Sequence, residues 1–397
     1  MLSRRSSTAK STRDLRIDWL RGLAMTCVII DHSKRSSLLS WFSYQRFWVV
    51  TAAEVFVVLS GLVLGMVYGP RLARDGWIVV ATRLGRRAAL LYAAFVGVTL
   101  SLLLLALAGV DVTSVSSWDP TAVMWFMDPR SMTAENWRDL ALLRYGPWAF
   151  EIVGLYVWLV LAAVPCLIAL HKVGWKPLLA VSWAIYFWYR VVPQPLTSAE
   201  FESVFPILAW QLLFVHGITI GYHREQIAHF VKHRLRLFPA AIAVASVVFM
   251  AFALSNPLME GPAWLHWRVF SPQQFSDLYE RYFSLTDLGL GRILNLAVAL
   301  PFGYGLLAWR GVATVASRLQ GVFVTLGQGS LGAFVLHVYG LLVLAHLPET
   351  DQLLVNTVVQ IALIVTIAVV LKALKRVSTA RRQQRVATAR VELPVAA

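Results

Sequence analysis

Long apolar segments follow one another along almost the whole chain, and this pattern constrains the fold more than any other feature. We count ten of them, with approximate limits at 15–33, 49–69, 88–110, 149–170, 177–193, 204–221, 237–255, 288–308, 320–346 and 353–371. Such segments, coiled as α-helices, suit the hydrocarbon core of a bilayer. A charged fraction of only 14% fits a chain whose apolar surface faces lipid. We therefore predict an all-α, polytopic membrane helix bundle of about ten transmembrane helices.

Basic residues alternate between the connecting segments. Most of the 36 Lys and Arg residues fall in the two tails and in every second connection. Because cytoplasmic segments are enriched in Lys and Arg, both termini are predicted to be cytoplasmic. Residues 1–14 and 375–397 are expected to be disordered basic tails around one transmembrane domain, 15–374. The net charge of +15 then reflects topology and attraction to anionic lipids, and we predict neither nucleic-acid binding nor a metal site.

The first apolar segment contains charged residues that a membrane span normally lacks, namely Asp18, Arg21, Asp31 and His32. Charge inside a bilayer is costly, so it persists where it is paired, solvated or used. Arg21 and His32 are separated by ten residues, which is about three helical turns and about 16 Å. They therefore share one helix face with Asp18.

These four side chains are the predicted catalytic residues. Histidine can take a proton from a hydroxyl and return it to a leaving group. Asp18 or Asp31 could orient or polarise His32, and Arg21 could hold negative charge. The alternative is a set of buried ion pairs that only fixes helix packing.

The second apolar segment adds Glu54 as a further catalytic candidate. Gly61, Gly65 and Gly69 then repeat at four-residue intervals, a spacing that lets two helices approach closely. Glu54 could pair with Arg21 or His32 across such a contact. A structural ion pair is an equally good interpretation of Glu54.

A basic cluster follows in the connection to the third apolar segment. It consists of Arg71, Arg74, Arg83, Arg86 and Arg87. Guanidinium groups grip phosphate through paired hydrogen bonds, so this connection is predicted to bind a phosphate-rich donor such as coenzyme A. Topology alone also requires basic residues at this point of the chain.

Other polar residues lie inside later apolar segments. Taken singly, each resembles a satisfied core residue, but together they predict a polar cavity that binds substrate: Glu151, Trp210, Gln211, Arg292 and His337. The connections 111–148 and 256–287 are long and contain several tryptophans. These rings could stack on sugars or form an interfacial belt.

The order of these motifs resembles a known family. Arg21 and His32, ten residues apart and opened by Ile17-Asp18, resemble the signature of the acyltransferase-3 superfamily of membrane acyltransferases. Other motifs are similar to its OpgC branch: Glu54 with Phe56 and Ser60-Gly61, Ala209-Trp210-Gln211, Leu288-Gly289 with Arg292, and Ser330 to His337.

OpgC proteins are inner-membrane O-succinyltransferases that decorate periplasmic glucans. The resemblance implies a multi-pass enzyme of a bacterial inner membrane that moves a succinyl group from cytoplasmic acyl-CoA to a hydroxyl of an extracytoplasmic glycan. Succinyl-CoA would be a substrate, and no permanently bound cofactor is implied. By the same resemblance, Arg21 and His32 match the essential pair of the superfamily.

Two other functions remain open at this stage. Intramembrane ionisable residues also serve a secondary transporter, here of a small anion or glycoconjugate. A sensor or scaffold that keeps the fold without catalysis is the third possibility. The sequence leaves the oligomeric state open.

Overall fold

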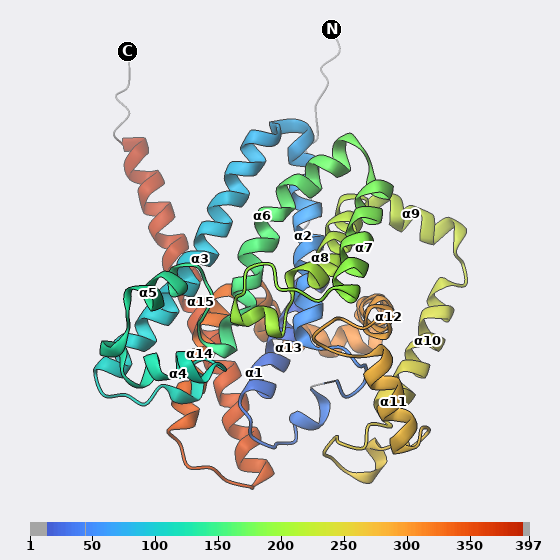
Figure 1. Cartoon of the computed structure of the whole chain (residues 1–397). Helices are drawn as coiled ribbons and strands as arrows, with labels where there is room; N and C mark the ends of the chain where they lie inside the picture. Colours follow the sequence, from blue (N-terminus) through green and yellow to red (C-terminus); the bar gives the residue numbers. More distant parts are fainter. Residues whose placement is uncertain (1–13, 44, 392–397) are drawn as a thin grey trace, which may run out of the picture.

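The computed structural model describes residues 14–43 and 45–391, and these form a bundle of helices without a β-strand (Figure 1). Short 3-10 turns join the α-helices in several connections. The α-helices are α1 Leu15–His32, α2 Ala52–Asp75, α3 Trp77–Leu107, α4 Pro120–Met127, α5 Ala134–Ala141, α6 Glu151–Lys172, α7 Trp175–Val191, α8 Ile207–Tyr222, α9 Arg224–Arg234, α10 Phe238–Ala253, α11 Pro272–Tyr282, α12 Leu290–Leu306, α13 Arg310–Gln328, α14 Ser330–Ala345 and α15 Leu353–Val391. The predicted all-α class is therefore confirmed.

Helix length gives fewer candidate membrane spans than the ten apolar segments of the sequence. By length and composition, 4 helices of the described chain can cross a membrane, within α2, α3, α6 and α15. The count rises to 6 if the bent pairs α9–α10 (97°) and α12–α13 (86°) are each one span. Helices α8 and α14 are apolar but have only 16 residues, or about 24 Å of rise. The count of ten and the side on which the termini lie stay predictions.

Three expected boundaries differ from the structure. The segment 320–346 is broken at Gly329, between α13 and α14, and the helix expected at 88–110 already begins at Trp77. The basic tail expected to be disordered from residue 375 continues α15 to Val391, because Ala, Arg, Gln and Lys are good helix formers. Residues 1–13 of the N-terminal tail and 392–397 lie outside the described residues.

The two ends of the bundle differ in character (Figure 1). The turn between α2 and α3, the helix α9 and the last turns of α15 lie at one end, at the top of the view. The long connections that contain α4, α5 and α11 lie toward the opposite end. This arrangement matches the alternation of basic and aromatic connections in the sequence.

Helices α2 and α8 form the most extensive helix contact in the described bundle, and the spacing of the α2 glycines predicts such a close approach. A Cβ added to Gly61 or Gly65 would overlap a backbone carbonyl of α8, and one added to Gly217 or Gly221 would overlap a carbonyl of α2. Glycine on both helices therefore lets the two backbones touch. The rest of α2 is held against α6 and α1 by buried apolar side chains.

This contact gives a test of the helix packing. Gly65→Ala places its Cβ against the carbonyl oxygen of Ile218, which cannot move without separating α2 from α8. We expect a loss of about 1–3 kcal/mol in the free energy of unfolding. Gly97→Ala in α3 is the control, because nothing lies within 4 Å of its Cβ. Equal thermal unfolding of both purified variants in detergent would contradict the packing.

Candidate active site

The polar stripe of α1 faces the break between α13 and α14. Asp14 caps the start of α1 by accepting a hydrogen bond from the backbone amide of Arg16 (3.0 Å). Asp18 accepts a hydrogen bond from Gln328 Nε2 (3.2 Å), and Arg21 Nη2 donates to Ser330 Oγ (2.6 Å). Because the chain breaks at Gly329, it presents a polar side chain on either side of the break to α1.

This end of α1 borders a cavity of about 660 Å³, which we call the Arg21 cavity. Arginines of three helices, α1, α3 and α9, line it: Arg21, Arg87 and Arg224. Asp14 and Asp18 line it as well. A cavity with three arginines in its walls is suited to an anionic ligand.

Asp14 marks the outer edge of the Arg21 cavity. Partial burial opposes its charge, but hydrogen bonds from Arg16 and Tyr304 outweigh the burial and hold the pKa of this carboxyl below its ordinary value. Asp14 is therefore ionised at neutral pH. Its charge partly offsets the arginines, so the cavity is not uniformly positive.

The other end of α1 borders a second cavity, of about 590 Å³, which we call the His32 cavity. His32 and Asp31 line it from α1, and Glu151 lines it from the first turn of α6. His32 Nδ1 lies 3.2 Å from His337 Nε2 on α14. Asp31 accepts a hydrogen bond from Ser43 Oγ (2.5 Å).

An aromatic cluster covers one side of the His32 cavity. The ring centroids of Trp148 lie 4.9 Å from those of both His32 and Trp118. The Lys34 ammonium lies over both tryptophans, 4.7 Å from Trp148 and 5.0 Å from Trp118. The cluster offers broad aromatic faces and one cation beside the histidine.

The four polar residues of α1 therefore divide between two cavities. Asp18 and Arg21 line one, whereas Asp31 and His32 line the other. About 16 Å of helix separates Arg21 from His32. One helix thus carries a guanidinium group, which suits phosphate, at one end and an imidazole, which suits proton transfer, at the other.

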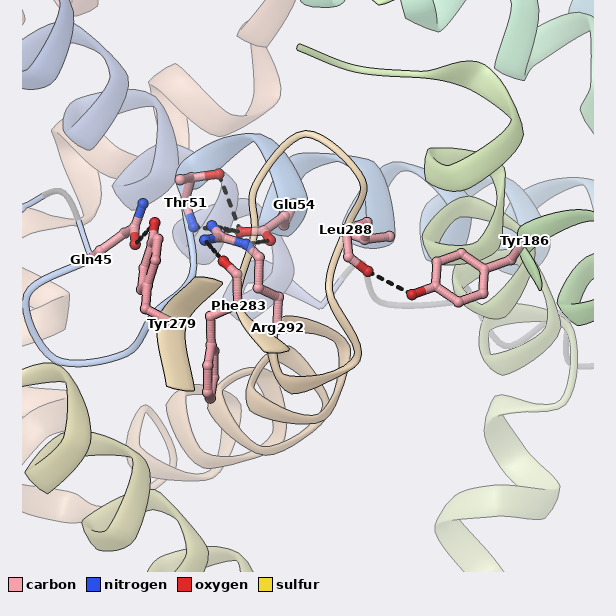
Figure 2. Close-up of polar contacts among 8 residues, drawn as sticks. All are labelled: Gln45, Thr51, Glu54, Tyr186, Tyr279, Phe283, Leu288 and Arg292. Atoms are coloured by element: carbon pink, nitrogen blue, oxygen red, sulfur yellow. Dashed lines mark hydrogen bonds and ion pairs between the residues drawn. The ribbon is translucent and has the colours of Figure 1, made fainter. Parts of the chain in front are cut away.

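Of the two interpretations of Glu54, the structure supports the structural ion pair. Glu54 forms an ion pair with Arg292 of α12 through two contacts, Nε to Oε1 (2.6 Å) and Nη2 to Oε2 (3.0 Å) (Figure 2). Both side chains are 0% exposed.

The ion pair is tied to the surrounding backbone, as Figure 2 shows. The Thr51 amide donates to Glu54 Oε2 (2.5 Å), and Arg292 Nη1 donates to the Phe283 carbonyl (3.1 Å). Together they connect the start of α2 to the connection before α12. This arrangement supports the structural interpretation of Glu54 and Arg292.

The predicted donor-binding arginines lie on helices rather than in a loop, because only Gly76, with φ of 80°, separates α2 from α3. Of the five, Arg87 alone is in the lining of the Arg21 cavity. Arg74 and Arg83 both pair with Asp75 (2.7 and 3.2 Å). Arg71 lies over the Tyr68 ring (5.5 Å), and Arg86 is exposed.

The predicted substrate-binding residues also divide. Glu151 lines the His32 cavity, is 2% exposed, and its Oε1 atom has no hydrogen-bond partner. Trp210 packs on Phe205 with a centroid distance of 4.9 Å, and Gln211 bonds to Ser182 of α7 (2.7 and 2.8 Å). Neither Trp210 nor Gln211 is in the lining of the two cavities.

Sequence reasoning missed several residues of the site. Lys34 and Arg224 belong to no motif of the sequence. Trp118 and Trp148 are among the tryptophans of residues 111–148, for which the sequence leaves sugar stacking and an interfacial belt open. A signal for Arg224 existed, because it closely follows the sixth predicted apolar segment, 204–221, on the basic side. Nothing local to the sequence places it beside Arg21.

Comparison with known proteins adds one finding. The model of a protein family described as OpgC protein matches residues 13–379. No curated protein and no solved structure matches the chain. The match covers both cavities and all of the predicted site residues.

Proposed function

Since the chain belongs to the OpgC protein family, which implies a membrane-bound, glucan-modifying acyltransferase, we propose that it transfers a succinyl group from cytoplasmic succinyl-CoA to a hydroxyl of a glycan on the other side of the membrane. The observation that carries this proposal is the division of one helix between two cavities. A bacterial inner membrane would be its location. The wider acyltransferase-3 assignment rests on the Arg21 and His32 spacing.

The Arg21 cavity would receive the donor. Phosphates of coenzyme A carry charge that Arg21, Arg87 and Arg224 can hold through short charge-assisted hydrogen bonds. The pantetheine arm is narrow and would then run along α1. This route brings the thioester from the cytoplasmic side toward His32.

The His32 cavity would receive the acceptor. Sugar rings present apolar faces that pack on aromatic rings, and Trp118 and Trp148 offer two of these beside His32. The unpartnered Glu151 carboxyl can hydrogen-bond to a sugar hydroxyl. The Lys34 ammonium would attract the free carboxylate of a succinyl group, which supports succinyl over acetyl transfer.

The chemistry needs one base. His32 takes the proton of the acceptor hydroxyl while that oxygen attacks the thioester carbonyl. The tetrahedral intermediate then collapses, the C–S bond breaks, and the thiolate takes the proton from His32. Direct attack needs no covalent intermediate on the enzyme. Transport of an anion is the alternative function, and the family does not favour it.

Donor binding tests the proposal. Arg87→Gln should raise the KM for radiolabelled succinyl-CoA roughly tenfold, because a hydrogen bond to a charged group contributes about 1.5–3 kcal/mol. Arg86→Gln is the matched control one position away, because its side chain is exposed and outside the cavity lining. Transfer to envelope glucan is measured with purified protein. Equal KM values for both variants would reject this donor site, and uptake without transfer in proteoliposomes would favour a transporter.

A further inference from the structure

The contact between His32 and His337 defines a role that the predicted chemistry leaves open. We propose that His337 is a positioning residue that fixes which ring nitrogen of His32 carries the proton, so that Nε2 of His32 is the base. This inference rests on the proposed function only for its consequence in catalysis. The hydrogen-bond pattern stands on its own.

The Phe334 carbonyl oxygen determines which atom donates in each of these two hydrogen bonds. His337 Nδ1 lies 2.6 Å from the backbone carbonyl of Phe334, and a carbonyl oxygen can only accept. The proton of neutral His337 is therefore on Nδ1, which leaves a lone pair on Nε2. His32 Nδ1, at 3.2 Å, must donate to that lone pair. His32 Nε2 is then unprotonated.

The position of His337 is fixed by packing. Its side chain is 0% exposed, and its ring lies against the Phe334 ring with a centroid distance of 5.6 Å. Phe334 in turn packs on Phe56 of α2, at 5.2 Å, and lines the His32 cavity. His337 therefore cannot turn away from His32 without disturbing this contact between α14 and α2.

A histidine at this place has an advantage over a carboxylate. Two neutral imidazoles add no charge to the interior of the bundle, where an uncompensated charge is costly. When His32 Nε2 gains a proton, its Nδ1–H still donates to His337, and the new charge is partly stabilised. The other ionisable groups that line the same cavity are Asp31, Lys34, Arg35, Glu151 and Glu260.

The first measurement of the test does not depend on catalysis. Protein labelled with 15N at histidine is observed by NMR, and the His32 resonances are assigned from a His32→Gln sample. In the wild type we expect Nδ1 protonated and Nε2 unprotonated. In His337→Leu we expect the two tautomers to mix, because the partner of Nδ1 is gone. An unchanged His32 tautomer in this variant would overturn the proposal.

The second measurement is transfer. His337→Leu should lower kcat roughly 10- to 100-fold, less than the loss of the base itself, with the KM for succinyl-CoA unchanged. His337→Gln keeps an acceptor near the position of Nε2 and should restore most of kcat, whereas a kcat as low as that of His337→Leu would contradict the proposal. His216→Leu is the matched control, because His216 Nδ1 also lies near a carbonyl one turn earlier, that of Leu212 (2.8 Å), but its ring faces Trp183 (5.7 Å). A fixed tautomer in a protein without transfer activity would reject the proposed function and leave the positioning role intact.

Discussion

Replacing His32 with alanine is expected to lower acyl transfer at least ~10²-fold, the usual scale for loss of a positioned acid–base group. His32 is the imidazole that lines the cavity beside the tryptophans, and His337 behind it is 0% exposed. Donor binding should survive, because the phosphates would be held about 16 Å away along α1. The expected change is therefore in kcat and not in the affinity for succinyl-CoA.

The experiment needs a folding control and a comparison variant. Gel filtration and thermal unfolding establish that His32→Ala is folded, and equilibrium binding of labelled succinyl-CoA establishes the donor site. Asp31→Asn is the comparison, because Asp31 lines the same cavity but already accepts a hydrogen bond from Ser43. We expect it to retain more activity than His32→Ala. Near-normal turnover by a folded His32→Ala variant would refute the mechanism.

Breaking the Glu54–Arg292 ion pair is expected to cost about 3–5 kcal/mol of folding free energy, because a single substitution leaves one buried charge without its partner. Arg292→Met removes the two contacts to Glu54 and the bond to the Phe283 carbonyl. Both side chains are 0% exposed, so water cannot replace these contacts. The start of α2 should loosen from α12.

A double substitution separates charge from packing. Arg292→Met combined with Glu54→Leu replaces the pair by apolar side chains, which is often neutral or stabilising for a buried ion pair. We expect the double variant to unfold at a higher temperature than either single variant in detergent. If the pair were catalytic, the double variant would be folded and would bind the donor but would not transfer the acyl group. Wild-type stability of Arg292→Met would contradict the structural role.

Periodic features of the sequence predicted the all-α class, whereas the count of ten spans stays a prediction. The helical class follows from the apolar segments, and the glycines of α2 predicted a close helix contact because their effect depends only on spacing within one helix. The partner helix, α8, was not predictable in this way. Span length also misled, because α13 and α14 are continuous in hydropathy and only the backbone at Gly329 separates them.

Contacts between residues that are distant in sequence could not be predicted, and the candidate site depends on several of them. Glu54 and Arg292 are 238 positions apart, and His32 and His337 are 305 apart, so no local pattern connects them. We predicted from the helix period alone that Asp18, Arg21 and His32 lie on one face of α1. In the structure all three line cavities. Of the arginine cluster, Arg87 lines the Arg21 cavity, whereas Arg74 and Arg83 pair with Asp75. Donor binding by the cluster stays a prediction, because proximity in sequence does not decide which side chains share a cavity.

The stretch of α1 between the two cavities has a consequence for the energetics of the cell. Ala24, Met25 and Ile29 are buried, apolar and outside the linings of both cavities, so apolar side chains separate the polar ends of the helix. Ions and protons cross such a region poorly, because hydrated charge does not enter hydrocarbon-like surroundings. We expect the resting protein to leave the electrochemical gradient intact.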